Sequence, residues 1–68
     1  MAYYYVNKNA QPTGEHEVHQ LSCDWLPKEE NRIYLGNFDS CAPAVREAKR
    51  YYSNVDGCYH CSPACHSR

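Results

Sequence analysis

The sequence has few large apolar side chains. Apart from Met1, its 68 residues include only four Val, three Leu, one Ile, one Phe and one Trp. Ordering a chain costs roughly 1.5 kcal/mol per residue, and so small an apolar core hardly offsets that cost. Chains of this size usually need a metal, disulfide bonds or a partner subunit as well. The composition therefore predicts one small domain, residues 1–68, with an additional source of stability.

Long apolar runs and an excess of one charge are also missing. No stretch of about 18 apolar residues exists, so the sequence predicts no membrane span. The first residues show no basic segment followed by an apolar stretch, so we expect no signal peptide and a cytoplasmic protein with reduced thiols. Seven basic and eight acidic side chains give a net charge of −1. This is not the pattern of a protein that binds nucleic acid by charge alone.

Tyrosine, cysteine and histidine are abundant instead. The seven tyrosines supply most of the remaining bulk. The runs at residues 3–5 and 51–52 are therefore interpreted as core, rather than as a surface on which nucleic-acid bases stack. Five cysteines and four histidines are candidates for a metal site or for disulfides. The odd number of cysteines argues against a fully closed disulfide framework.

The predicted strands are short. Residues 3–6 are aromatic and β-branched, and residues 15–20 can pair with them as an antiparallel hairpin across the turn at 11–14. Residues 33–36 are another strand candidate. Residues 21–32 contain Pro27 and a polar run, which indicates an irregular loop. We therefore expect a short antiparallel sheet.

One principal helix is predicted at about 40–53. Asp39 or Ser40 can cap it, and Pro43 falls in the first turn, where its missing N–H does no harm. Apolar side chains recur at helical spacing along one face: Cys41, Val45, Ala48 and Tyr52. A small basic patch on the other side is interpreted as a solvated face: Arg46, Lys49 and Arg50. The helix and the sheet together predict an α+β fold.

The strongest chemical signal is the C-x₂-C motif at residues 58–61. Two cysteines at this spacing, entered through a Gly-containing turn, direct both sulfurs at one ion, and tetrahedral Zn²⁺ requires four such ligands. A second pair, with the spacing H-x₃-C, lies before the helix. We therefore predict a structural zinc site that joins the two halves of the chain, with the ligands His19, Cys23, Cys58 and Cys61. A thioredoxin-like redox pair is disfavoured, because no βαβ framework surrounds the motif.

The remaining cysteines leave alternatives open. Cys41 is interpreted as a free thiol that packs as a small hydrophobe on the apolar helix face. Cys65 or His66 could replace His19 as the fourth ligand. A Cys41–Cys65 disulfide is also conceivable, if the C-terminal segment folds back on the helix.

The other two histidines are not predicted to bind the metal. His16 lies three positions before His19, which places the two on opposite faces of a strand. We expect His16 at the surface or next to a ligand. His60 lies inside the C-x₂-C loop and is expected to be exposed.

The ligand pattern resembles that of the Ada-like metal-binding domain superfamily. Small members of that superfamily have a His or Cys, a Cys four residues later, an intervening helix and a closing C-x₂-C. The likeness spans residues 19–61 and rests on the four predicted ligands. A longer string is similar to a family of short, uncharacterised bacterial proteins: Gly14-Glu15-His16-Glu17-Val18-His19, Tyr34-Leu35-Gly36, Ser40-Cys41, Asp56-Gly57-Cys58 and Cys65-His66.

The resemblance to the Ada domain implies a metal scaffold but not its reaction. In that domain the first cysteine ligand accepts a methyl group from a DNA phosphate, and four thiolates make the site electron-rich. The matching position here is His19, which provides no sulfur to alkylate and leaves the site less negative. Methyl-transfer repair is therefore disfavoured, and the DNA contacts of that domain are not expected.

Three classes of function follow from these patterns. The favoured one is a non-enzymatic zinc-binding module that contacts protein or nucleic acid, because four protein ligands would leave no open position for catalysis. The second is a thiol-redox protein or an enzyme with a zinc-bound water. The third is a domain held together by disulfides without metal. The sequence specifies neither the partner nor the biological process.

Overall fold

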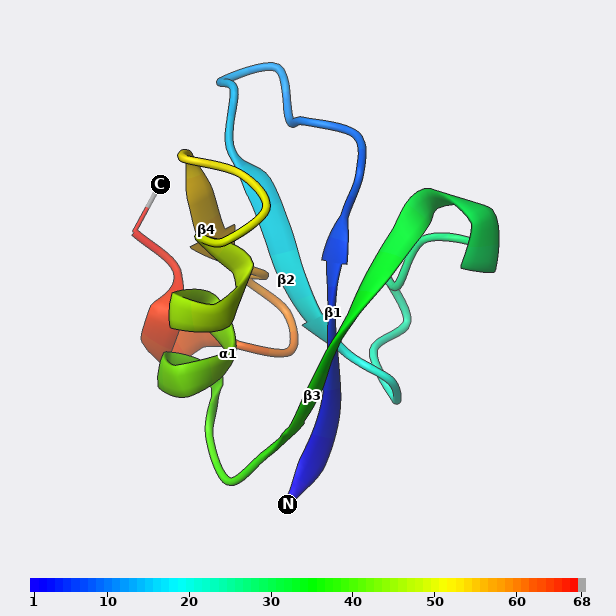
Figure 1. Ribbon diagram of the computed structural model, residues 1–68, viewed down its shortest axis with the longest axis vertical. Coiled ribbons are helices and arrows are strands. Elements are labelled where there is room, and N and C mark those ends of the chain that lie inside the picture. Colours follow the sequence, from blue (N-terminus) through cyan, green and yellow to red (C-terminus); the bar gives the residue numbers. More distant parts are fainter. Residues whose placement is uncertain (68) are drawn as a thin grey trace.

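The computed structural model describes residues 1–67 and has the predicted α+β fold (Figure 1). One four-stranded sheet has the strand order β3-β1-β2-β4. Two short 3₁₀ helices, Glu29–Asn31 and Pro63–Cys65, lie in the connections. The longer elements, in chain order, are β1 (Ala2–Asn7), β2 (His16–Gln20), β3 (Arg32–Phe38), α1 (Cys41–Ala48) and β4 (Val55–Gly57).

The centre of the sheet is antiparallel, as expected. β1 and β2 form the predicted hairpin, with Val6 opposite Val18. β3 pairs with the other side of β1, also antiparallel. The expectation of an entirely antiparallel sheet is wrong at one edge, because β4 pairs with β2 in parallel. Helix α1 connects β3 at one edge of the sheet to β4 at the other edge (Figure 1). After this crossing, β4 runs in the same direction as β3.

Helix α1 covers one face of the sheet, and the core lies between them. The fully or nearly buried apolar side chains are Tyr4, Val6, Val18, Leu35, Ala44 and Ala48. Leu35 reaches this core through a bulge in β3. Tyr4 of β1 pairs with Gly36 and Tyr5 pairs with Tyr34, so Leu35 is the extra residue between them. A bulge places two residues opposite one and redirects a side chain. Gly36, at φ +138°, supplies the backbone conformation that the bulge requires.

The helix is shorter than predicted. It begins after Ser40 and ends at Ala48, whereas the apolar spacing continues to Tyr52. Backbone bonds from Tyr51 and Tyr52 to the Ala48 carbonyl close a final turn, and the ring of Tyr52 stacks on His16 at 3.7 Å. The spacing therefore predicts the side of α1 that faces the core, but not where the helix ends.

The tyrosines are mostly not in the core, contrary to the prediction. Only Tyr4 is nearly fully buried, because the alternation of β1 turns Tyr3 and Tyr5 to the sheet face away from α1. Tyr5 is half-buried on that open face and packs against Tyr34, with 5.4 Å between ring centroids. Besides Tyr4, aliphatic side chains fill the buried contact between helix and sheet.

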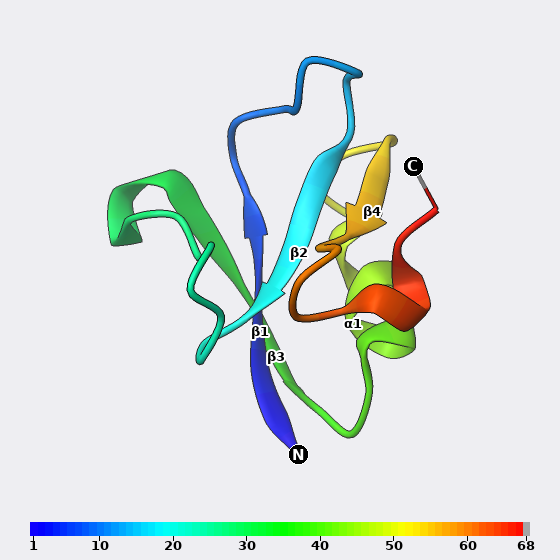
Figure 2. The same ribbon diagram turned by 180° about the vertical axis from the view of Figure 1, so that it is seen from behind.

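The interpretation of Cys41 as a free thiol is wrong. Cys41 forms a disulfide with Cys65, the pairing that the sequence left as an alternative. The C-terminal segment folds back against α1, as seen from both sides of the molecule (Figures 1 and 2). Residues 1–67 contain no helix that is long and apolar enough to cross a membrane.

Candidate metal centre

The parallel pairing of β2 and β4 brings His19 and Cys58 together. Val18 lies opposite Gly57 in the register, so the next residue of each strand lies beside the other. The Cys58 N–H continues the ladder by donating to the Val18 carbonyl at 2.9 Å. These two residues, 39 positions apart in the numbering, thus become neighbours at the same end of the sheet.

Two tight turns supply the other candidate ligands. The Cys23 N–H donates to the Gln20 carbonyl at 3.0 Å, which turns the chain back directly after β2. The Ser62 N–H donates to the Cys58 carbonyl at 2.8 Å and closes the C-x₂-C loop. Gln20 joins the two turns, because its backbone N–H donates to Cys61 Sγ at 3.3 Å and its amide to the Cys61 carbonyl at 3.0 Å.

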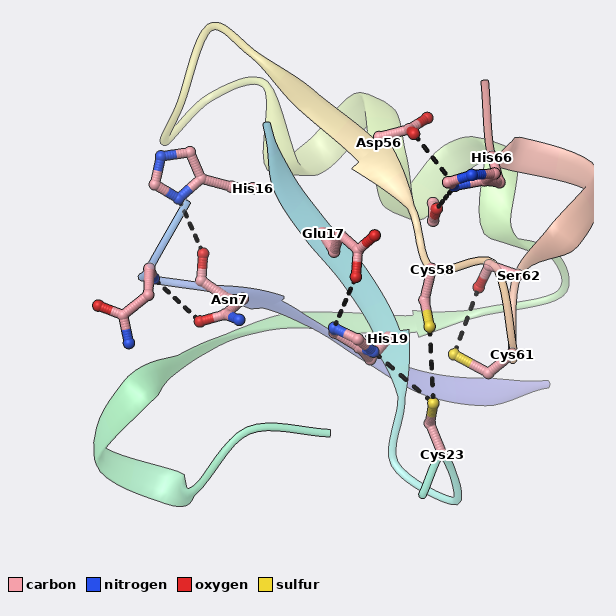
Figure 3. A network of polar contacts seen from close by, with 12 residues as sticks. Asn7, His16, Glu17, His19, Cys23, Asp56, Cys58, Cys61, Ser62 and His66 are labelled. Carbon is pink, nitrogen blue, oxygen red and sulfur yellow. Dashed lines mark hydrogen bonds and ion pairs between the residues drawn. The ribbon is translucent and has the colours of Figure 1, made fainter. Parts of the chain in front are cut away.

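The four predicted ligands converge on one point, as the sticks in Figure 3 show. Their donor atoms all lie within 4.8 Å of one another. Cys23 Sγ is 3.9 Å from Cys58 Sγ and 3.6 Å from His19 Nδ1. In a regular tetrahedron with Zn–S bonds of about 2.3 Å and Zn–N bonds of about 2.0 Å, these separations would be about 3.8 and 3.5 Å. His19, Cys23, Cys58 and Cys61 could therefore hold a metal ion.

His19 has the orientation and the protonation state that metal binding requires. Its side chain is 2% exposed, and burial, helped by the positive charge of His60, lowers its pKa to about 4. The imidazole is therefore neutral at neutral pH. Nδ1 faces Cys23, while Nε2 lies 3.8 Å from Glu17 Oε1 on the same strand face (Figure 3). A carboxylate behind a histidine ligand helps to orient the ring.

The thiols of Cys23 and Cys58 are protonated in the absence of a cation. Burial, together with hydrogen bonding to Cys61, raises the pKa of Cys23 to about 12. Burial also raises the pKa of Cys58, more than the Cys61 and His60 backbone N–H groups lower it. A bound metal would reverse this preference, because thiolates are the ligand form and binding releases protons.

The alternative ligands lie elsewhere. Cys65 is bonded to Cys41 and has no free sulfur. His66 Nδ1–H donates to the Gly57 carbonyl at 2.9 Å, and the same nitrogen lies 3.2 Å from Asp56. Among residues 1–67, the group of side chains that could hold a metal ion includes His19 and does not include His66.

The two histidines outside the predicted site have separate contacts. His16 lies on the helix side of β2, where it stacks on Tyr52 and its Nδ1–H donates to the Asn7 carbonyl at 2.9 Å. His60 is exposed, as expected, and stacks on Trp25 with 4.6 Å between the ring centroids. The sequence reasoning missed Trp25 and Glu17. The spacing of both residues from the ligands could have indicated their roles. Glu17 precedes His19 by two residues and therefore lies on the same face of the strand, and Trp25 follows Cys23 by two residues.

Comparisons with known proteins find no counterpart for this arrangement. The chain matches no family model, no curated protein and no solved structure. The geometry of the four candidate ligands therefore carries the functional argument by itself.

Proposed function

We propose that this protein is a non-enzymatic binding module whose fold is stabilised by a structural zinc ion. The observation that carries the proposal is the convergence of one imidazole nitrogen and three sulfurs within 4.8 Å. Thiolate and imidazole donors suit Zn²⁺, and tetrahedral N/S sites are typical of structural zinc. The relation to Ada-like domains is proposed on the same four positions.

A structural role is favoured over a catalytic one. Four protein ligands complete the tetrahedron, whereas catalytic zinc usually keeps one position for water or substrate. His19 and Cys58 are almost completely buried at the ends of two paired strands. Their backbones are held by the sheet, so they contribute to the folding of the domain.

The proposed zinc ion would also add stability that the small apolar core does not provide. In residues 1–67, six apolar side chains make up the buried core cluster, and two of them are alanines. The candidate ligands come from β2 and the turn after it and from the segment after β4, so an ion would join these two parts of the chain. The disulfide alone joins Cys65 to α1 and leaves the β2–β3 connection without a cross-link. A domain held together by the disulfide without metal therefore does not explain why His19 and Cys23 converge with Cys58 and Cys61.

Native mass spectrometry of the protein purified without added chelator tests the proposal. We expect one zinc ion per chain and, for the disulfide, a polypeptide mass lower by two hydrogen atoms. Cys58→Ser should abolish stoichiometric zinc binding, because it removes a thiolate from the closed site. The double variant Cys41→Ala/Cys65→Ala is the matched control and should retain one zinc. A native chain that folds without metal, or that pairs Cys58 with Cys61 in a disulfide, would contradict the proposal.

A further inference from the structure

A cleft of about 270 Å³ opens beside the candidate metal centre, on the sheet face away from α1. Asn7, Glu17 and His19 come to it from β1 and β2. Gln11, from the β1–β2 connection, completes one side. Three aromatic side chains form the rest of its lining: Trp25, Tyr59 and His60.

The aromatic wall is attached to the metal-binding turns. Trp25 follows Cys23 by two residues, and Tyr59 and His60 lie between Cys58 and Cys61. The Trp25 and His60 rings are stacked nearly parallel, at 14°, and Tyr59 meets His60 edge-on at 5.5 Å. Trp25 is nevertheless 62% exposed. The wall thus presents a large aromatic surface to solvent, held in place by the turns that carry the ligands.

The described lining of the cleft contains a carboxylate and no Lys or Arg side chain. Among residues 1–67, Glu17 is the carboxylate that lines the cleft. Within the described part of the chain, Glu17 Oε1 lies 3.8 Å from Nε2 of the neutral His19 ring, and no Lys or Arg pairs with Glu17. The neighbouring carboxylate of Asp56 is already bonded to Ser67 and His66. Zn²⁺ with three thiolates and a neutral imidazole would add a formal charge of −1.

The same sheet face already holds one cation on an aromatic ring. The Arg32 guanidinium lies over the Tyr5 ring, 4.7 Å from its centroid. Aromatic faces attract guanidinium and ammonium groups, more strongly where water is partly excluded, and tryptophan is the best of them. A carboxylate beside such a wall adds charge-assisted hydrogen bonds. Anions, including nucleic-acid phosphates, would be repelled by the same groups.

We propose that this cleft binds an organic cation, a guanidinium or alkylammonium group, between the Glu17 carboxylate and the Trp25–His60 stack. The inference rests on the proposed function, because zinc would hold the two turns that form the wall. It narrows that function to the recognition of a positively charged side chain or small molecule. Gln11 and Asn7 add neutral hydrogen-bonding groups at the rim.

Fluorescence offers a direct test, since Trp25 is the single tryptophan of the chain. Zinc-loaded protein would be titrated with N-acetyl-arginine amide, with N-acetyl-lysine amide and with a short arginine-containing peptide. N-acetyl-citrulline amide, the neutral isostere of the arginine compound, is the matched ligand control. We expect saturable changes in Trp25 emission with the cations and none with citrulline.

Two variants of cleft residues and one control variant test whether the change in Trp25 fluorescence arises from binding in the cleft. Glu17→Gln should weaken binding of the cation about tenfold, the loss expected from one charge-assisted hydrogen bond. Glu29→Gln, in the exposed 3₁₀ helix at residues 29–31, removes the same charge away from the cleft and should leave affinity unchanged. Tyr59→Ala shortens the wall and should also weaken binding. Zinc content, measured for each variant, identifies any that has lost the metal centre.

The outcomes separate the two proposals. Equal affinities for arginine and citrulline, unchanged affinity in Glu17→Gln with zinc retained, or displacement of the cation by single-stranded DNA at the cleft would overturn this inference alone. Absence of zinc from the purified protein would instead overturn the proposed function. Tighter binding of the peptide than of the single amide supports the cleft as a site for a protein segment. Equal binding of the two supports a small cationic ligand.

Discussion

At the scale of single residues, Gly57 determines how closely the C-terminal segment can approach the sheet. A Cβ atom at this position would lie 2.6 Å from Cys65 Cβ and 2.9 Å from the Ser62 carbonyl oxygen. Both neighbours are held in place, Cys65 by its disulfide and Ser62 by its bond to Cys58. The sequence predicted only a turn at this glycine.

Gly57→Ala should therefore lower the free energy of unfolding by about 1–3 kcal/mol, as overpacking does in a tight contact. Urea unfolding of the zinc-loaded protein measures the change. Ser53→Ala, at an exposed position, is the control and should stay within about 0.5 kcal/mol of the parent. Equal stabilities of the two variants would show that the segment can move away from β4 at little cost.

His19 and His16 provide a matched pair of residues on one strand. His19→Ala should reduce zinc affinity at least about 100-fold, because it removes a ligand from the closed site. His16→Ala removes a histidine from the other face and should leave zinc affinity unchanged while losing the stacking contact with Tyr52. Competition with a chromophoric chelator measures both. Equal zinc affinities for the two variants would assign the fourth ligand elsewhere.

At the scale of elements, small side chains let α1 lie close to the sheet. Ala44 and Ala48 are both completely buried against strand residues of the core. The helical spacing of apolar residues predicted which face is buried. It did not predict the end of the helix, because the turn after Ala48 depends on where Tyr52 meets His16.

Ala44→Leu should destabilise the fold by about 1–3 kcal/mol, because the added atoms have no space between helix and sheet. Ala42→Leu places the same side chain on the exposed side of α1 and should change stability by less than about 0.5 kcal/mol. Thermal unfolding followed by circular dichroism compares them. A stable Ala44→Leu variant would mean that α1 can shift away from the sheet.

At the scale of the whole molecule, two cross-links would hold the chain. The disulfide joins the start of α1 to the C-terminal segment, and the four candidate ligands join the ends of β2 and β4. They involve different cysteines, so each can be removed by substitution without removing the other. Their presence fits a chain whose apolar core is small for its length.

The double variant Cys41→Ala/Cys65→Ala should lose about 3.5 kcal/mol of stability, the loop-closure value for residues 24 positions apart. Its zinc content should not change. Urea unfolding at saturating zinc gives the first quantity and native mass spectrometry the second. Loss of zinc in this variant would mean that the disulfide and the metal centre form one unit.

The predictable features of this protein depend on residues close together in the chain. The hairpin, the buried face of α1 and the two candidate ligand pairs, His19 with Cys23 and Cys58 with Cys61, follow from local spacing, because a strand, a helix or a tight turn orients neighbours in a regular way. Tertiary structure decided the remainder: the parallel edge strand β4, the Cys41–Cys65 disulfide and the cleft at Glu17 and Trp25. These features join segments that are far apart in the chain, so the spacing of residues within a strand or helix does not indicate them. The packing of α1 and the C-terminal segment brings these segments together.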